Sequence, residues 1–280
     1  MNSLVIEARC KINLGLEVLR RRPDGFHDID TVFQCVSLSD ELEIARAPRG
    51  TVRLEVEGGG VTAGPENLVW RAALAHAKAT GADGAAIVLR KRVPVAAGLG
   101  GGSSDAAATL VGLDRLYSTG LPTEALRRLA LVLGSDVQYF VEGGTARGRG
   151  RGEVLEPLPP LRGVWFVLVT PPAEVSAKAA YERIRIGLTR SRGFINLVCS
   201  AIQERDHRAL ARALGNDLEP GVVALCPEVG SLLTLLRERG ATGAVMKGSG
   251  PTAVGVALRR DDADRVAASL AGHGRRVHFV

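Results

Sequence analysis

The chain has 280 residues, 46% of them hydrophobic and 24% charged, which is enough to bury ordinary cores and long enough to predict two domains. Its net charge is +6, but the basic residues are spread along the whole chain and aromatic residues make up only 4%, which argues against a base-stacking nucleic-acid interface. The four cysteines lack metal-type spacing and the longest apolar run is strand-sized, so we expect reduced thiols, no zinc site, no membrane span and a cytoplasmic location.

The N-terminal part of the chain alternates apolar and polar residues in the way that strands do. Strands are predicted at residues 4–8, 14–19, 41–45 and 52–56, in an antiparallel arrangement. Lys11 and Asn13 are two residues apart and therefore share one face of a strand. They can address one ligand together, although a lysine in a strand is usually solvent-facing.

The most informative stretch of the sequence runs from Pro94 to Ser104, after a helix predicted at 67–80 and a strand at 86–89. Its four glycines, at positions 98 and 100–102, allow positive φ and let a ligand approach the main-chain N–H groups. We expect Ser103 or Ser104 to cap a helix whose positive dipole end points to the same place. Loop and helix together predict a phosphate-binding site, and no Walker motif is present.

The remaining elements are predicted around two further features of the sequence, a helix that ends at Gly134 and a proline-rich run at 157–160. A helix opens at 122–124 and ends at Gly134, and Asp136 comes directly after it, either as a catalytic carboxylate or as an N-cap. A hairpin is predicted within 143–152, and the proline-rich run at 157–160 divides the chain into domains 1–157 and 158–280. For the second domain we predict strands at 164–169, 243–246, 252–258 and 276–279, and helices near 176–184, 193–204, 208–214, 228–240 and 261–271.

Two motifs carry a family resemblance. The pattern P-x-x-x-G-L-G-G-G-S-S-D-A-A, which begins at Pro94, resembles the ATP-binding motif of the GHMP kinases. Residues 8–16 and 21–27 are similar to the branch of that superfamily that phosphorylates the 2-hydroxyl of diphosphocytidyl-methylerythritol. The resemblance implies an α+β, two-domain GHMP kinase fold. It also implies an N-terminal ribosomal-protein-S5-like α/β domain, a C-terminal ferredoxin-like α/β domain and an active site in the cleft between them.

The same resemblance implies residue roles. Asp136 would accept the proton of the substrate hydroxyl, and Lys11 would keep that carboxylate ionised, because an opposite charge favours the ionised form. ATP and Mg²⁺ are the implied cofactors, although no metal ligands can be picked out. The nucleotide would contact Asn67, Lys91, Pro94, Val95, Ala96, Ala97, Gly98, Leu99, Gly100, Gly101, Gly102, Ser103 and Ser104.

The acceptor substrate, a cytidine-diphosphate-linked methylerythritol, would contact Asn13, Phe26, His27 and Tyr181. An aromatic ring can stack on cytosine while His27 hydrogen-bonds its edge, and such stacking contributes about 1–3 kcal/mol. Tyr181 is a possible second stacking face, and an ordinary helix position explains it equally well.

The chain departs from the pattern of the GHMP kinases at three positions. Lys247 stands before the third motif, residues 248–252, where the family usually has serine or threonine; it either adds a phosphate contact or points outward. Phe26 replaces the common tyrosine and Gln138 the common proline. Loss of the tyrosyl hydroxyl leaves the stacking face in place.

Three functions therefore stay open on sequence alone. The first is the cytidyl-substrate kinase, the second a GHMP kinase for another small alcohol such as homoserine or mevalonate, and the third a non-catalytic nucleotide- or RNA-binding module. Residues 24–27 favour the first over the second, and the presence of both Lys11 and Asp136 argues against the third. A monomer or a weak homodimer without nucleic-acid or membrane partners is expected.

Overall fold

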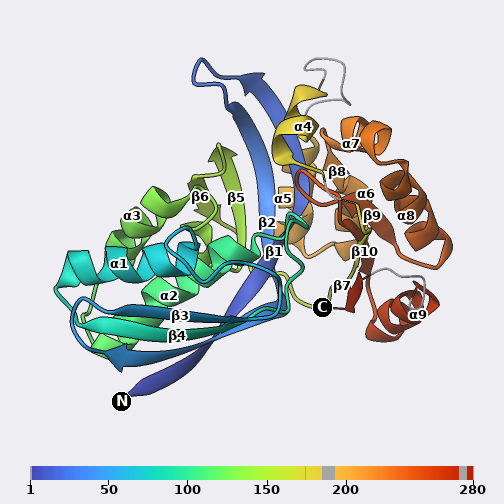
Figure 1. Ribbon diagram of the computed structural model, residues 1–280. Helices are drawn as coiled ribbons and strands as arrows, with labels where there is room; N and C mark the ends of the chain where they lie inside the picture. The colour runs from blue at the N-terminus through green and yellow to red at the C-terminus, as the bar shows by residue number, and fades with distance from the viewer. Residues whose placement is uncertain (1, 174, 185–192, 271–275, 280) are drawn as a thin grey trace. The chain divides into compact units, whose positions relative to one another are not determined.

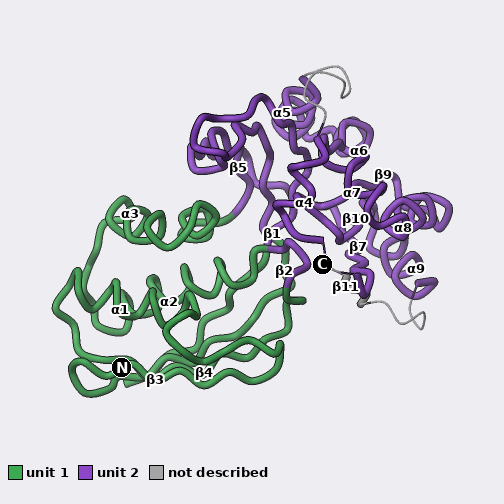
Figure 2. The backbone as a smooth tube through the Cα atoms, turned by 45° about the horizontal axis from the view of Figure 1, so that its top comes forward, with its two compact units in different colours: residues 1–10, 36–95, 100–143 green, residues 11–35, 96–99, 144–280 purple. Residues whose placement is uncertain are grey.

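The structure is a computed structural model that describes residues 2–173, 175–184, 193–270 and 276–279 (Figure 1). The chain forms two compact units: unit 1 comprises residues 1–10, 36–95 and 100–143, and unit 2 comprises residues 11–35, 96–99 and 144–280 (Figure 2). The glycine-rich stretch contributes to both units, since residues 96–99 belong to unit 2 and their flanks to unit 1. The domain boundary at 157/158 stays a prediction.

The strands within the described part of the chain are β1 (Ser3–Arg21), β2 (His27–Ala47), β3 (Val52–Glu57), β4 (Gly84–Arg90), β5 (Thr145–Gly150), β6 (Val154–Pro157), β7 (Trp165–Thr170), β8 (Gly215–Asn216), β9 (Gly243–Met246), β10 (Ala253–Ala257) and β11 (Arg276–Phe279). The α-helices there are α1 (Leu68–Thr80), α2 (Gly101–Tyr117), α3 (Thr123–Leu133), α4 (Ala177–Glu182), α5 (Phe194–Glu204), α6 (His207–Ala213), α7 (Glu219–Leu225), α8 (Pro227–Glu238) and α9 (Arg260–Leu270), with a 3₁₀ turn, η1, at Tyr139–Val141.

Unit 1 packs helices on a sheet. In this unit β4 pairs antiparallel with the second half of β2 and parallel with β3. The expectation of a purely antiparallel arrangement is therefore wrong at β3, because α1 connects β3 to β4 as the crossover that a parallel pair requires. Alternation within a strand reports which face is buried and carries no information about the partner's direction. Helices α1 and α2 cover one face of these strands (Figure 1), and their apolar residues meet those of β2 and β4 in one core.

The first half of unit 2 is built on the long strands. The strands expected at 4–8 and 14–19 are one 19-residue strand, β1, whose residues 10–18 are all buried. In unit 2 the first half of β2 pairs antiparallel with β5, and β8 pairs parallel with β1 at Gly15 and Leu16. Strand β5 pairs with β6 in a hairpin that extends to residue 157, beyond the range 143–152 predicted for it. The elements β8 and α7 were not predicted, because a two-residue strand and a seven-residue helix give too short a periodic signal.

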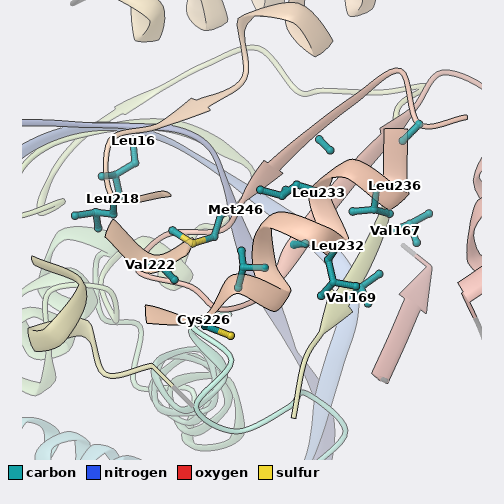
Figure 3. Packing of buried hydrophobic residues seen from close by; sticks show 14 of the residues in the cluster. Leu16, Val167, Val169, Leu218, Val222, Cys226, Leu232, Leu233, Leu236 and Met246 are labelled. Carbon is teal, nitrogen blue, oxygen red and sulfur yellow. The ribbon is translucent and has the colours of Figure 1, made fainter. Parts of the chain in front are cut away.

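The second sheet of unit 2 has the strand order β11-β7-β10-β9, and its pairings are antiparallel. This order, with helices after the first and third strands, is the split βαβ arrangement of ferredoxin-like domains and agrees with the expectation. Leu232, Leu233 and Leu236 of α8 pack against Val167 and Val169 of β7 (Figure 3). The same core reaches Leu16 of β1, so β1 is anchored on this sheet's helices.

No single helix in the described ranges is long and apolar enough to cross a membrane; by length and composition only the pair α7 and α8, bent by 117°, reaches that threshold.

Candidate functional site

The face of β1 that carries Lys11 and Asn13 is buried in unit 2. Lys11 is 4% exposed and Asn13 2%, so the solvent-facing interpretation of Lys11 is wrong. The Lys11 ammonium donates to Asn13 Oδ1 at 3.1 Å, and Asn13 Nδ2 donates to Thr31 Oγ1 at 2.7 Å. Thr31 donates in turn to the Gly15 carbonyl at 2.5 Å. Because every polar atom of the Asn13 amide is engaged in this chain of bonds, the Lys11 ammonium is held at a defined position.

The middle of the glycine-rich stretch lies directly beside this strand. The backbone N–H of Lys11 donates to the carbonyl of Leu99 at 3.0 Å. Gly98 and Gly100 both have φ of +73°, the left-handed region in which glycine carries no Cβ penalty, and Ala96 has φ of +57°. The stretch therefore turns sharply at 96–100 before the chain enters α2.

The helix that follows is capped differently from the expectation. Helix α2 begins at Gly101, and its N-cap residue is Gly100, which makes no side-chain capping bond. The expected serine cap is wrong: Ser103 and Ser104 lie inside the first turn, and Ser104 Oγ donates to the carbonyl of Arg9 at 2.7 Å. Gly101 and Gly102 are thus helical residues. Of the four glycines in this stretch, only Gly98 and Gly100 adopt a positive φ.

This helix start has the properties of an anion site. Its first turn holds no acidic residue, so the positive end of the helix dipole is not compensated there by a carboxylate. A Cβ atom added at Gly102 would meet nothing within 4 Å, so the main chain is bare and open at this residue. The first N–H groups of a 17-residue helix are available to phosphate oxygens under these conditions.

A second glycine loop, residues 247–252 of unit 2, contacts residues 96–99. Thr252 Oγ1 donates to the carbonyl of Ala97 at 2.9 Å. A Cβ atom on Gly98 would lie 2.8 Å from the carbonyl oxygen of Gly250, so only glycine permits this approach. The outward-pointing interpretation of Lys247 is wrong, because Lys247 is 2% exposed.

Lys91, expected near adenine, lies in a buried charge cluster of unit 1. Its ammonium, with the side chain 4% exposed, donates to Asp40 Oδ2 at 2.5 Å and to Asp105 Oδ2 at 2.7 Å. Asp40 Oδ1 accepts the backbone N–H groups of Arg92 and Val93 at 2.5 and 2.8 Å. Sequence analysis missed Asp40 and Asp105, since neither the 51- nor the 14-residue separation from Lys91 gives a local signal.

The protonation of the cluster follows from its burial. Burial raises the pKa of Asp105 to about 8, against the opposing pull of Lys91 and with a further rise from Asp40. Burial lowers the pKa of Lys91, but the carboxyl groups of Asp105 and Asp40 outweigh it and leave that pKa above its usual value. Asp105 Oδ1 is buried and has no hydrogen-bond partner. Asp105 is thus the group that holds a proton at neutral pH.

Asn67 opens α1, as expected. Its Oδ1 accepts the N–H of Val69 at 2.9 Å, and its Nδ2 donates to the carbonyl of Thr62 at 2.7 Å. The amide therefore fixes the start of the helix, and its predicted role beside adenine stays a prediction.

The predicted substrate loop joins β1 to β2 within unit 2. Gly25 has φ of +85°, and Asp24 Oδ1 accepts the N–H of Phe26 at 3.1 Å, which sets the turn. Phe26 is 55% exposed, and the Arg151 guanidinium lies 5.0 Å from the centroid of its ring. An exposed aromatic ring with a cation on it can receive a second flat ring.

Two of the predicted substrate residues come together. The rings of His27 and Tyr181 stack with centroids 5.0 Å apart, so Tyr181 of α4 is placed beside the substrate loop. Burial, and then the charge of Arg21, lower the pKa of His27, which leaves the imidazole neutral at pH 7. A neutral imidazole offers one donor and one acceptor, which suits the edge of a nucleobase.

Asp136 lies in the turn between α3, which ends at Gly134 as expected, and η1. It is half-buried, and its neighbour Val137 is fully buried, which anchors the turn. The N-cap of η1 is Gln138, so the N-cap interpretation of Asp136 is wrong.

Asn216, a second residue that sequence analysis did not single out as functional, holds the loop at 247–252. Asn216 Nδ2 donates to the carbonyls of Met246 at 2.8 Å and Gly248 at 2.6 Å, and β8 places it opposite Leu16. The run Asn-Asp-Leu-Glu at 216–219 resembles the GHMP kinases and is the sequence pattern that could have identified this residue.

The chain matches two family models, the GHMP kinases N terminal domain at residues 67–145 and the GHMP kinases C terminal at residues 199–276. Among curated relatives, the 4-diphosphocytidyl-2-C-methyl-D-erythritol kinase of Pelotomaculum thermopropionicum is 46% identical over 93% of this chain and 91% of its own. The enzyme of that name from Moorella thermoacetica is 45% identical over 96% of this chain and 95% of its own.

Solved structures of kinases also resemble this chain. A crystal structure of 4-(cytidine 5'-diphospho)-2C-methyl-D-erythritol kinase has a TM-score of 0.84 at 35% identity, covering 99% of this chain and 98% of its own. Homoserine kinase from Cytophaga hutchinsonii has a TM-score of 0.81 at 18% identity, covering 100% and 94%, and shares the fold.

The buried cluster predicts a pH dependence of stability. Between about pH 4 and pH 8 folded Asp105 holds a proton that an unfolded aspartic acid, with its ordinary pKa of 3.8, has released. The folded state then binds more protons than the unfolded state, so stability falls as pH rises through this window. Relative to Asp105→Asn, the wild type should lose unfolding free energy with a slope of at most about 1.4 kcal/mol per pH unit.

Urea denaturation at several pH values between 4 and 9 measures this difference. Asp264→Asn, which removes an exposed carboxylate of α9, is the control and should keep the wild-type profile. Parallel profiles for the wild type and Asp105→Asn would show that Asp105 is ionised in the fold.

Proposed function

Since the chain belongs to the 4-diphosphocytidyl-2-C-methyl-D-erythritol kinase family of the GHMP kinases, we propose that it transfers the terminal phosphoryl group of ATP to the 2-hydroxyl of that substrate. The products are ADP and the 2-phosphate, an intermediate of non-mevalonate isoprenoid biosynthesis, formed in the cytoplasm. The observation that carries the proposal is the 46% identity over 93% of the chain to a relative of that name. The matched family regions lie on either side of the domain boundary proposed at 157/158.

The glycine-rich stretch binds the phosphates of the nucleotide in this proposal. Three observations support it: the helix start at Gly101 without an acidic first turn, the open main chain at Gly102, and the positive φ at Gly98. The first two leave N–H groups accessible to phosphate oxygens, the positive φ lets the chain turn sharply before the helix, and the helix dipole favours the negative charge of the phosphates. Asn67 and Lys91 are proposed to lie near the adenine.

Mg²⁺ is proposed to accompany the nucleotide. Among the residues that the structure describes, no group of three or more His, Cys, Asp or Glu side chains is arranged to hold a metal ion. Magnesium commonly keeps several waters and takes further ligands from substrate phosphates, so its binding does not require such a group. When bound, the ion neutralises negative charge on the phosphate oxygens.

Lys11 and Asp136 are proposed as the catalytic pair. Asp136 accepts the proton of the 2-hydroxyl as the new oxygen–phosphorus bond develops, and a weak base suffices because the hydroxyl becomes acidic only in the transition state. Lys11 adds positive charge for the transferring phosphoryl group. The hydrogen bond from its ammonium to Asn13 supports this role, because a pre-positioned charge needs no reorganisation during the reaction.

The acceptor end is proposed to bind at the β1–β2 loop. Phe26 provides an exposed ring for cytosine, and neutral His27 hydrogen-bonds the base edge. Tyr181 stacks on His27 and so holds the imidazole plane, a supporting role instead of a direct contact with cytosine. The likeness to homoserine kinase is one of fold, so the cytidyl substrate is favoured over another small alcohol.

Coupled ADP release from purified protein tests the proposed function. We expect turnover with ATP, Mg²⁺ and the cytidyl substrate, and at least about a hundredfold lower kcat/KM with homoserine, mevalonate or galactose, which lack the base. Comparable rates with one of these alcohols would overturn the substrate assignment, and no ADP release with any of the four substrates, the cytidyl substrate included, would overturn the kinase activity.

Asp136→Asn should lower kcat by about 10²- to 10⁴-fold, the usual contribution of a positioned acid or base. The nucleotide dissociation constant should stay within about twofold, because the substitution keeps shape and removes only the charge. Steady-state kinetics and calorimetric titration with ATP measure the two quantities. Near-full activity would make Asp136 a structural residue of its turn.

The substitution Gly102→Ala should weaken ATP binding without lowering the stability of the protein. The added methyl meets no atom within 4 Å and lies in a helix, where alanine is up to about 1 kcal/mol more favourable than glycine. The variant should therefore be at least as stable as the wild type in urea. It should bind ATP about tenfold or more weakly, because phosphate oxygens lose their close approach to the main chain. Unchanged ATP affinity would place the phosphates elsewhere.

A further inference from the structure

An aromatic ring lies against the ammonium of Lys11. The Nζ atom of Lys11 is 4.6 Å from the centroid of the ring of Phe33, a residue of β2. Phe33 is 2% exposed and Lys11 4%, so the contact lies inside unit 2 and is shielded from water. A cation in front of an aromatic face is attracted by the quadrupole of the ring, and the attraction is stronger when the pair is desolvated. The pair therefore has both the geometry and the burial of a strong cation–π interaction.

The chain makes room for this ring by leaving out two side chains. A Cβ atom on Gly148 of β5 would lie 2.5 Å from Cε2 of Phe33, which is too close for any side chain. A Cβ atom on Gly152, in the turn after β5, would lie 3.2 Å from Cζ of the same ring, and Gly152 also has a φ of +103°. Two glycines of the run Arg-Gly-Arg-Gly-Arg-Gly at 147–152 thus accommodate the ring of Phe33.

Pairing between strands sets where the ring lies. Phe33 pairs with Ala146 in the antiparallel register of β2 and β5. Thr31, two residues earlier, shares the same face of β2 and accepts a hydrogen bond from the Asn13 amide. The Lys11 ammonium is therefore held by groups from two strands: Asn13 of β1 accepts its hydrogen bond, and Phe33 of β2 offers the face of its ring.

A ring and a carboxylate act differently on a buried ammonium. A carboxylate adds a full negative charge beside the cation, as Asp40 does at Lys91. The neutral ring attracts the cation, but it brings no net charge and accepts no proton. Phe33 can therefore hold an ammonium in place without itself cancelling the charge that attracts a phosphoryl group.

We propose that Phe33 is a positioning residue for Lys11: the face of its ring holds the ammonium where Lys11 acts on the transferring phosphoryl group. The role of Lys11 rests on the proposed function, whereas the attraction between ring and ammonium does not. A purely structural role for Phe33 makes a different prediction, because a residue that only fills space depends on the size of the ring and not on the electron density of its face.

Site-specific replacement of Phe33 by mono-, di- and trifluorinated phenylalanine tests the inference. Each fluorine withdraws electron density from the face of the ring and changes its volume little, so the attraction to a cation weakens stepwise. The series is made in the wild type and in Lys11→Met, which keeps the length of the side chain without its charge. Phe166, a buried phenylalanine of β7 in the same unit, carries the same series as the control.

Urea denaturation measures the attraction without any turnover. Trifluorination at position 33 should raise the unfolding equilibrium constant about 3- to 30-fold more in the wild type than in Lys11→Met, the range of a buried cation–π pair. At Phe166 the effect of fluorination should be the same with and without Lys11. An effect at position 33 that is equally large in both backgrounds would overturn the inference.

Steady-state kinetics with the cytidyl substrate measures the positioning role. Along the series at position 33 kcat should fall stepwise, by up to about 30-fold for the trifluorinated ring, while KM stays within about twofold, because Lys11 acts in the transition state. The series at Phe166 should leave kcat unchanged. A constant kcat along the series at position 33 in an active enzyme would overturn the positioning role. A wild type that releases no ADP with any of the four substrates would overturn the proposed function, and the unfolding data would still decide whether the ring holds Lys11.

Discussion

The hydrogen bond between the backbone N–H of Lys11 and the carbonyl of Leu99 ties the buried strand β1 to the glycine-rich stretch. Strand β1 is buried through residues 10–18, so its polar backbone groups must find partners inside the protein. Residues 96–99 supply one of these partners, and Thr252 holds the same residues through Ala97. The four-residue segment is thereby fixed within unit 2, while the helix that it leads into belongs to unit 1.

The buried lysines of this protein differ in the groups that surround their ammonium. Lys91 is surrounded by two carboxyl groups, Asp40 and Asp105, and one of these keeps its proton because a single ammonium cannot offset two buried negative charges. Lys11 instead donates to a neutral amide, and Lys247 points at a glycine backbone. The two carboxyl groups around Lys91 offset its positive charge within the fold.

The loop that joins β1 to β2, which is proposed to bind the acceptor, exposes an apolar side chain to solvent. Phe26 is 55% exposed because the turn set by Gly25 and Asp24 lifts it from the sheet. The next residue, His27, is partly covered by Tyr181 and stays neutral as a result of that burial. An exposed ring next to a neutral imidazole suits a neutral aromatic base and supports the proposed preference for a cytidyl substrate.

The sequence by itself determined the features that depend on residues close together in the chain. The turn glycines at 98 and 100, the helix start at Asn67, the helix end at Gly134 and the strand face shared by Lys11 and Asn13 all follow from local stereochemistry. Only the tertiary structure decided the partners that come from distant segments. The parallel pairing of β3, the two carboxyl groups around Lys91, the contact of Tyr181 with His27 and the inward course of Lys247 are of this kind. Packing in three dimensions sets the burial of these groups and the distances between them, and burial and distance in turn set the free energy of each charge, which no local pattern encodes.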